Sequence, residues 1–209
     1  MAALYRIKEP QGGSVTAIVR QALAVEGAEP RIGFFVWSRV RRMVTLKSAY
    51  MAKFPDYYAP ERVRDCHFSE PVGDSPLGLA ARRGKPLHWE KTSDLQAYRL
   101  GLVNTYVNSP ELDKQVAAGK IKTLMADDDV QNLRNLLAGK VDAVVIDRNV
   151  YAYLLRPGGS LEAAGQQLAL NPRVLIVHKL YVCFQKTEEG RALRDRFNRG
   201  LKTLQAATP

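Results

Sequence analysis

The first strong pattern along the chain is a helical stripe that follows the glycine pair at 12–13. Its apolar residues recur at spacings of three and four, and they are Val15, Ile18, Val19, Ala22 and Leu23. This spacing places them on one face of a helix. Ser14 can cap the start of such a helix, and Gly27 can end it. The pattern therefore predicts an amphipathic helix with one buried face.

The rest of the first half alternates short apolar runs with turn-forming residues. Four runs predict strands, and they are Arg31–Val36, Ala49–Phe54, Arg64–Phe68 and Leu77–Arg82. Between the first two strands, Ser38–Lys47 predicts a short basic helix. Gly84 and Pro86 then mark a break in composition, where a second series of elements can begin.

The second half repeats strands and helices of about ten residues. Its predicted strands are Arg99–Val103, Ile121–Met125, Val141–Ile146 and Leu180–Gln185. Its helices begin after Ser109, Asp128, Asp147 and Thr187, residue types that cap helix starts. This alternation predicts an α/β protein with a mainly parallel sheet.

Composition and charge narrow the class of protein. Of the 209 residues, 46% are apolar and 25% are charged, as in ordinary globular domains, and no apolar run is long enough to predict a membrane-spanning helix. The net charge of +10 would suit an acidic partner such as nucleic acid or anionic lipid. The basic residues are instead spread along the chain, which favours a solubilising surface, so no nucleic-acid partner is expected. Residues 1–10 lack the apolar segment of a signal peptide, although an exported protein can begin after its signal.

Cysteines and histidines predict little chemistry. Cys66 and Cys183 are too few for a disulfide framework, so they form either one bridge or two buried thiols, and their strand-like surroundings favour thiols. His67, His88 and His178 are scattered, and no Cys/His cluster has the spacing of metal ligands. Neither a metal nor a cofactor is expected.

Four segments, in order, carry a resemblance to a known family. They are Trp37-Ser38-Arg39, Pro60–Pro71 (PERVRDCHFSEP), Gln131–Leu155 (QNLRNLLAGKVDAVVIDRNVYAYLL) and Leu180–Leu204. Together they resemble the polar amino-acid family of periplasmic solute-binding proteins. That resemblance spans the chain from Gly12 onward. It implies a two-lobed periplasmic-binding-protein-like fold, in which each lobe is a mainly parallel sheet flanked by helices and the ligand lies in a cleft between the lobes.

The resemblance also implies lobe boundaries and two charged ligand contacts. Lobe one would comprise residues 1–88 completed by 181–209, and lobe two residues 89–180. Arg62 matches the family's carboxylate-binding arginine, because a guanidinium can hold a carboxylate with two parallel hydrogen bonds. Asp147 matches the aspartate that receives the ligand ammonium. Both also have structural interpretations, Arg62 as a surface residue in a turn and Asp147 as a helix cap.

Other positions match the family's ligand contacts less specifically. Trp37 matches an aromatic position that packs on the ligand side chain, and it could equally be a core residue. In lobe one the matching loop consists of Phe54, Pro55, Asp56 and Tyr57, and in lobe two the matching helix start consists of Tyr106, Val107 and Asn108. For these residues, structural and ligand-binding roles are equally compatible with the sequence.

The chain also departs from the family pattern. Only Met1–Gln11 precedes the glycine pair, so the family's first strand is short or absent. The usual threonine before Pro60 is Ala59, and the small hydroxyl residues of lobe two are replaced around Tyr106-Val107. A monomer is expected, with a dimer that supplies the missing strand as the alternative.

The function that the resemblance implies is binding without catalysis. The chain would bind a small polar solute, most simply an amino acid, in the periplasm and deliver it to the membrane subunits of an ABC importer. A sensor or stand-alone solute-binding domain is one alternative. An enzyme similar to cyclohexadienyl dehydratases is another, and it would need a general acid or base, for which the cleft offers only Asp56, Asp147 and tyrosines.

Overall fold

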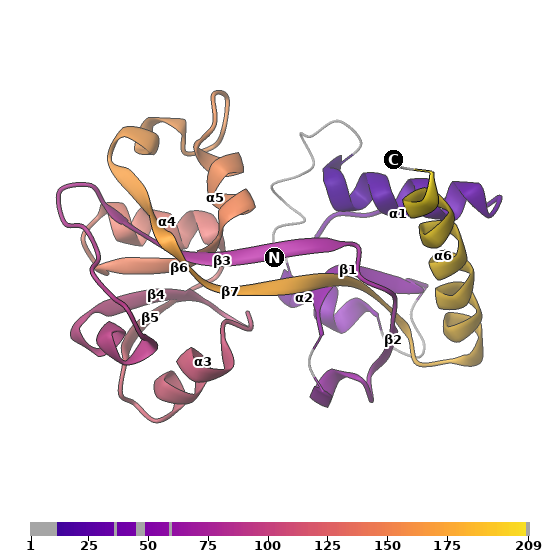
Figure 1. Cartoon of the computed structure of the whole chain (residues 1–209), viewed down its shortest axis with the longest axis horizontal. Helices are drawn as coiled ribbons and strands as arrows, with labels where there is room; N and C mark the ends of the chain where they lie inside the picture. Colours follow the sequence, from indigo (N-terminus) through magenta and orange to yellow (C-terminus); the bar gives the residue numbers. More distant parts are fainter. Residues whose placement is uncertain (1–11, 36, 45–48, 59, 208–209) are drawn as a thin grey trace. The chain divides into compact units, whose positions relative to one another are not determined.

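The computed structural model describes residues 12–35, 37–44, 49–58 and 60–207 (Figure 1). The chain forms two compact units, of which the first comprises Met1–Asp74 with His178–Pro209 and the second Ser75–Val177. The changeovers fall inside strands β3 (Gly73–Arg82) and β7 (Leu168–Gln185). The sequence predicted lobe boundaries at 88/89 and 180/181, and that division into ligand-binding lobes stays a prediction.

The first unit is built on the C-terminal half of β7. Strands β1 (Ala52–Tyr57) and β2 (Cys66–Phe68) both pair with it in antiparallel fashion. A short 3₁₀ turn, Pro60–Arg62, connects the two. The predicted α/β class is confirmed, but the strand pairs described in this unit are antiparallel rather than parallel.

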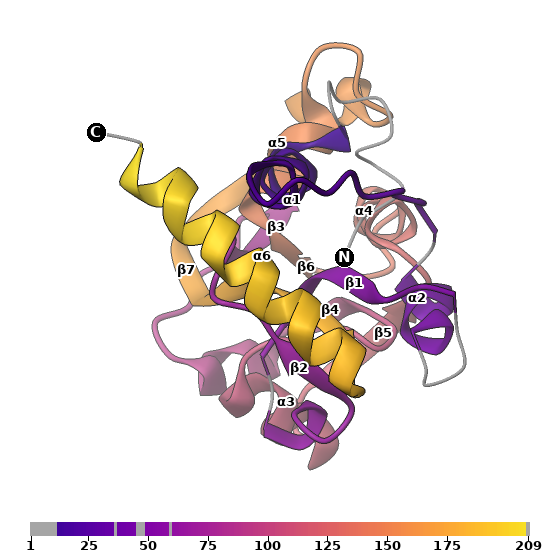
Figure 2. The same ribbon diagram turned by 90° about the vertical axis from the view of Figure 1, so that its right-hand side faces the viewer.

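Two helices pack against each other at one side of the first unit (Figure 2). Helix α1 (Ser14–Val25) is the helix predicted from the apolar stripe, although Gly13 rather than Ser14 is its N-cap. Helix α6 (Glu188–Ala206) approaches it at Gly200, where a side chain would collide with the carbonyl of Ala22. Close contact of the two backbones therefore requires a residue without a Cβ.

The predicted strand Arg31–Val36 is wrong. Residues 31–35 form no strand and are half-buried or exposed, and Val36 lies outside the described residues. A strand needs a neighbour for its N–H and C=O groups, and no described strand pairs with this segment. The family's first strand would fall within Met1–Gln11, also outside the described residues. The short helix that follows, α2 (Trp37–Met43), agrees with the prediction in its first part.

Cys66 and Cys183 form a disulfide, so the preferred interpretation of two buried thiols is wrong. In the β2–β7 pair, Cys66 lies opposite Gln185 and Cys183 opposite Phe68. The two cysteines are therefore diagonal neighbours on the same face, with Cα atoms 5.6 Å apart, which is within the usual range for a bridge. The bridge joins β2 to the strand that organises the unit.

The second unit holds a mixed sheet in the order β3-β6-β4-β5, with β7 beside β3. Strands β4 (Arg99–Val103), β5 (Lys122–Ala126) and β6 (Ala143–Asp147) match their predicted positions within two residues and pair in parallel, whereas β3 pairs with β6 in antiparallel fashion. Its helices are α3 (Pro110–Ala117), α4 (Asp129–Leu137) and α5 (Arg148–Leu155). The predicted parallel arrangement thus holds for β6, β4 and β5 of this unit.

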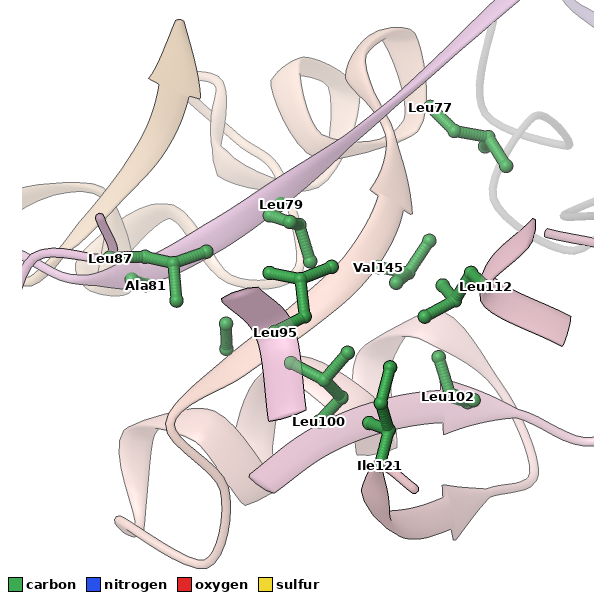
Figure 3. Close-up of a cluster of buried hydrophobic side chains, with 11 residues drawn as sticks. Leu77, Leu79, Ala81, Leu87, Leu95, Leu100, Leu102, Leu112, Ile121 and Val145 are labelled. Atoms are coloured by element: carbon green, nitrogen blue, oxygen red, sulfur yellow. The ribbon is translucent and has the colours of Figure 1, made fainter. Parts of the chain in front are cut away.

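One apolar cluster fills the space between this sheet and its covering segments (Figure 3). Leu79 on β3, Leu100 on β4, Leu112 on α3 and Leu95 in the turn Thr92–Ala97 are all fully buried. Each contributes about 1.5–3 kcal/mol by leaving water. Among the described residues, no helix has both the length and the apolar character needed to cross a membrane.

Removal of the disulfide should destabilise the first unit. The bridge closes a loop with a sequence separation of 117, so replacing both cysteines by alanine should lower the free energy of unfolding by roughly 2–5 kcal/mol. Denaturant unfolding of the wild type with and without dithiothreitol, beside the double variant, measures the effect. The reductant should weaken the wild type and leave the variant unchanged. Equal stability of all three samples would contradict the bridge.

Candidate functional site

In the first unit, a bulge in β1 gathers charged side chains on one face. Lys53 pairs with Cys183 and Asp56 with Tyr181, so three steps along β1 match two steps along β7. The extra residue reverses the normal alternation, and Lys53 and Asp56 can therefore lie on the same side. Pro55, which lacks an N–H group, lies within this bulge, where it interrupts no ladder hydrogen bond.

Asp56 is the centre of this charged group. Its side chain is 1% exposed, and its Oδ1 atom accepts hydrogen bonds from Arg62 Nη1 at 2.5 Å and from the Tyr57 N–H at 2.9 Å. The Lys53 ammonium lies 3.3 Å from Oδ2 but makes no hydrogen bond with it. Arg62 is placed there by the 3₁₀ turn that follows β1. We call Lys53, Asp56 and Arg62 the first-unit charge cluster.

The other predicted residues of this unit lie around the cluster. The Lys53 ammonium is 5.7 Å from the centre of the Trp37 ring, a cation–π distance. The buried Tyr57 ring instead stacks on His178 at 4.4 Å. Phe54 and Pro55 are half-buried in β1. The structure therefore brings Trp37, Asp56 and Arg62 together with Lys53, a residue that the sequence analysis missed.

In the second unit, Asp147 ends β6 and caps α5, as predicted. Its Oδ1 atom accepts the N–H groups of Asn149 at 2.6 Å and Val150 at 2.9 Å, and its Oδ2 atom accepts the hydroxyl of Ser75. The side chain is buried, with Asp147 only 4% exposed. Three donors from within the unit therefore satisfy both oxygens of this buried carboxylate.

The segment Tyr106–Asn108 connects β4 to α3, where Ser109 caps the helix by accepting the Leu112 N–H. Asp113 accepts hydrogen bonds from both the backbone and the side-chain amide of Asn108, at 3.1 and 2.8 Å. Both donors of Asn108 at this helix start are thus already paired with an internal carboxylate. Tyr106 points elsewhere, since its hydroxyl donates to Asp129 at 3.2 Å.

Asp129 is a buried carboxylate that the sequence analysis did not single out. It is 2% exposed at the start of α4, and burial raises its pKa to about 6. The hydrogen bond from Tyr106 opposes this shift, and the charges of Asp128 and Asp147 add to it. In the sequence it is hidden in the triplet Asp127–Asp129, of which Asp128 serves as the predicted helix cap. The second unit therefore buries two neighbouring aspartates.

No metal centre accompanies these carboxylates in the part of the chain that the structure describes. There, no three His, Cys, Asp or Glu side chains are grouped so as to hold a metal ion. Asp56 faces two cations, and Asp147 accepts N–H and O–H donors. The arrangement suits recognition of charged groups by ion pairing and hydrogen bonding.

Solved structures with the same fold include several solute-binding domains. Arginine-binding ArgBP from T. maritima in its holo form has a TM-score of 0.76 at 18% identity, covering 92% of this chain and 80% of that one. A histidine kinase sensor domain with similarity to periplasmic binding proteins has a TM-score of 0.80 at 19% sequence identity. The match covers 93% of this chain and 81% of that one. The ancestral amino-acid-binding protein AncCDT-1, a precursor of cyclohexadienyl dehydratase, has a TM-score of 0.72 at 16% sequence identity. The match covers 93% of this chain and 79% of that one.

These likenesses confirm the predicted two-lobed periplasmic-binding-protein-like fold. Because the identities are below 20%, they show the fold and leave the ligand to be argued from this chain's own residues. No protein-family model matches the sequence, and no curated protein matches it either.

The raised pKa of Asp129 predicts how stability depends on pH. The folded state holds this proton more tightly than the unfolded state, so the contribution of Asp129 to stability is greatest below pH 4 and is lost as the pH rises from about 4 through about 6. Asp129→Asn removes this loss, and the variant should exceed the wild type at pH 7.5 by on the order of 1–3 kcal/mol.

Urea unfolding at pH 7.5 and pH 4 measures this difference, which should shrink toward zero at the lower pH. Asp127→Asn is the matched control, because Asp127 is exposed in the same triplet. An Asp129→Asn protein that is less stable than the wild type at both pH values would contradict the assignment.

Proposed function

We propose that this chain binds a small polar solute, specifically an amino acid, and delivers it to the membrane subunits of an ABC importer. The observation that carries the proposal is the first-unit charge cluster, in which Arg62 and Lys53 outnumber Asp56. A cluster with one excess positive charge suits a single ligand carboxylate. The shared fold supports a binding role, since similar structures include proteins named for binding arginine and other amino acids.

Arg62 has the capacity to hold a ligand while it holds Asp56. Only one of its nitrogens, Nη1, bonds to Asp56, and its side chain is 13% exposed. A guanidinium offers five N–H donors in a planar fork, so donors remain for a second carboxylate. The neighbouring Trp37 ring and the Lys53 ammonium would lie beside the bound group.

Asp147 is the proposed partner of the ligand ammonium. Its oxygens accept three hydrogen bonds within the second unit, and an ionised carboxylate can accept about four. One acceptor position therefore remains for an ammonium N–H. Asp129 adds a second negative charge nearby, which favours a cation further.

The disulfide supports a periplasmic location. Disulfides form and persist in oxidising compartments, and this one is buried between two paired strands. An importer in the adjoining membrane would then be the partner that receives the solute. We infer a monomer that acts by binding and release rather than by catalysis.

A sensor role is the second candidate. The histidine kinase sensor domain has a TM-score of 0.80 to this chain, higher than that of the arginine-binding protein. A sensor domain would bind its solute with the same residues but would signal through a covalently attached module. The two roles share the binding site, so a binding experiment tests what they have in common.

A thermal-shift screen is the direct test of solute binding. The purified chain is heated with amino acids, polyamines and small organic acids in turn. A ligand present at about 100 times its Kd stabilises the folded state by about 2.7 kcal/mol, which raises Tm by several degrees. Stabilisation by one chemically related set supports the proposal, whereas an unchanged Tm across the whole screen would refute it.

Substitution of Arg62 tests the carboxylate contact. Arg62→Ala should weaken binding of the stabilising solute by roughly 30-fold or more, since loss of one partner of a buried charge pair costs about 2–5 kcal/mol. Arg62→Lys keeps the charge but loses the fork, and it should recover only part of the affinity. Isothermal titration calorimetry measures both.

Arg64→Ala is the control for charge alone. Arg64 is 81% exposed and pairs with Asp65, so its removal takes the same charge from the same unit without touching the cluster. Its affinity should equal that of the wild type. The assignment of Arg62 fails if Arg62→Ala and Arg64→Ala bind the solute equally well.

A further inference from the structure

We propose that Asp56 is a specificity-determining residue that limits the first unit to one ligand carboxylate. This inference rests on the proposed function, because it requires Arg62 to bind the ligand. With two cations and one internal carboxylate, the first-unit charge cluster carries a net charge of +1. One ligand carboxylate neutralises it, and a second would leave an uncompensated negative charge.

The cluster is layered, with its cations on the accessible side. The Asp56 side chain is 1% exposed, whereas those of Lys53 and Arg62 are 12% and 13% exposed. A ligand carboxylate can therefore reach the two cations more readily than it can reach Asp56. Asp56 cannot move its charge into water, so it lowers the positive potential that the ligand experiences whether or not the ligand touches it.

The bonding of Asp56 differs from that of an aspartate whose two oxygens are both held by donors of its own unit. Both oxygens of Asp147 accept hydrogen bonds from its own unit. Among the described residues, Asp56 Oδ2 accepts no hydrogen bond, and the Lys53 ammonium lies 3.3 Å from it. This oxygen contributes charge to the cluster without holding any element in place. A buried charge on an oxygen that accepts no hydrogen bond is better suited to selecting ligands by their charge than to stabilising the strand.

Charge selection follows from the cost of burying unpaired charge. A buried carboxylate is tolerated when a cation compensates it and is strongly disfavoured otherwise. The wild-type cluster should accordingly accept amino acids with one carboxylate and discriminate against dicarboxylates. Removing the Asp56 charge while keeping its shape should relax that discrimination.

L-Glutamine and L-glutamate are the probes for this inference, because they have the same shape and differ by one negative charge. The measured quantity is the ratio of their Kd values from calorimetric titration at pH 7.5. Wild type should prefer glutamine, and in Asp56→Asn the preference should fall by about tenfold or more, since a repulsive charge is a common source of discrimination. Asp56→Ser serves as a second variant if Asn impairs folding.

Two further variants separate charge from structure. Asp65→Asn removes an equal charge from a side chain that is 66% exposed and pairs with Arg64, and it should leave the ratio unchanged. Lys53→Gln makes the cluster neutral and should weaken binding of both probes. Combining Lys53→Gln with Asp56→Asn restores the net charge of +1, and glutamine affinity should return toward the wild-type value.

The outcomes distinguish this inference from the proposed function. If the wild type is stabilised by amino acids but Asp56→Asn keeps the wild-type ratio, the inference is overturned and the proposed function stands. If Asp56→Asn loses stability without changing the ratio, Asp56 is structural and the inference is likewise overturned. If neither probe binds the wild type or either Asp56 variant, the inference fails, and the wider solute screen on the wild type decides the proposed function separately.

Discussion

Buried carboxylates are the constraint on which the organisation of both units depends. An aspartate that leaves water must be given cations or hydrogen-bond donors, because its charge is otherwise too costly to bury. Asp56 faces Arg62 and Lys53, Asp147 faces the start of α5, and Asp129 faces one tyrosine hydroxyl. As a result, the first unit carries a cluster with a net positive charge, and the second unit buries the carboxylates of Asp129 and Asp147.

The strand framework explains how such charges are held in place. The turn that carries Arg62 lies between β1 and β2, and both strands pair with β7. The disulfide between β2 and β7 restrains the same region covalently. The bulge around Pro55 turns Asp56 toward the face that carries Lys53. The bulge therefore positions Lys53 and Asp56, and the 3₁₀ turn positions Arg62.

The sequence predicted what short-range rules determine. Strand β4 and the caps Asp128, Asp147 and Thr187 lie where predicted, because residue type and spacing specify them. Two segments differ from what their local sequence predicts: residues 31–35 form no strand, and the N-terminal half of β7 is a strand that was not predicted. The former lacks a described strand partner, and the latter contains Pro172 and charged residues that disguise a strand. Lys53 and the disulfide depend on register between distant strands, which no single segment encodes. Asp129 was concealed by its acidic neighbours.

The proposed role of Arg62 is to hold the carboxylate of an amino-acid-like solute. Native mass spectrometry of the freshly purified protein, before any unfolding step, tests it most directly. We expect an additional mass equal to that of a small carboxylate-bearing solute, which disappears after unfolding and refolding and is missing from Arg62→Ala. Bare protein alone, with no such mass recovered when the preparation is incubated with a mixture of amino acids, would contradict the claim.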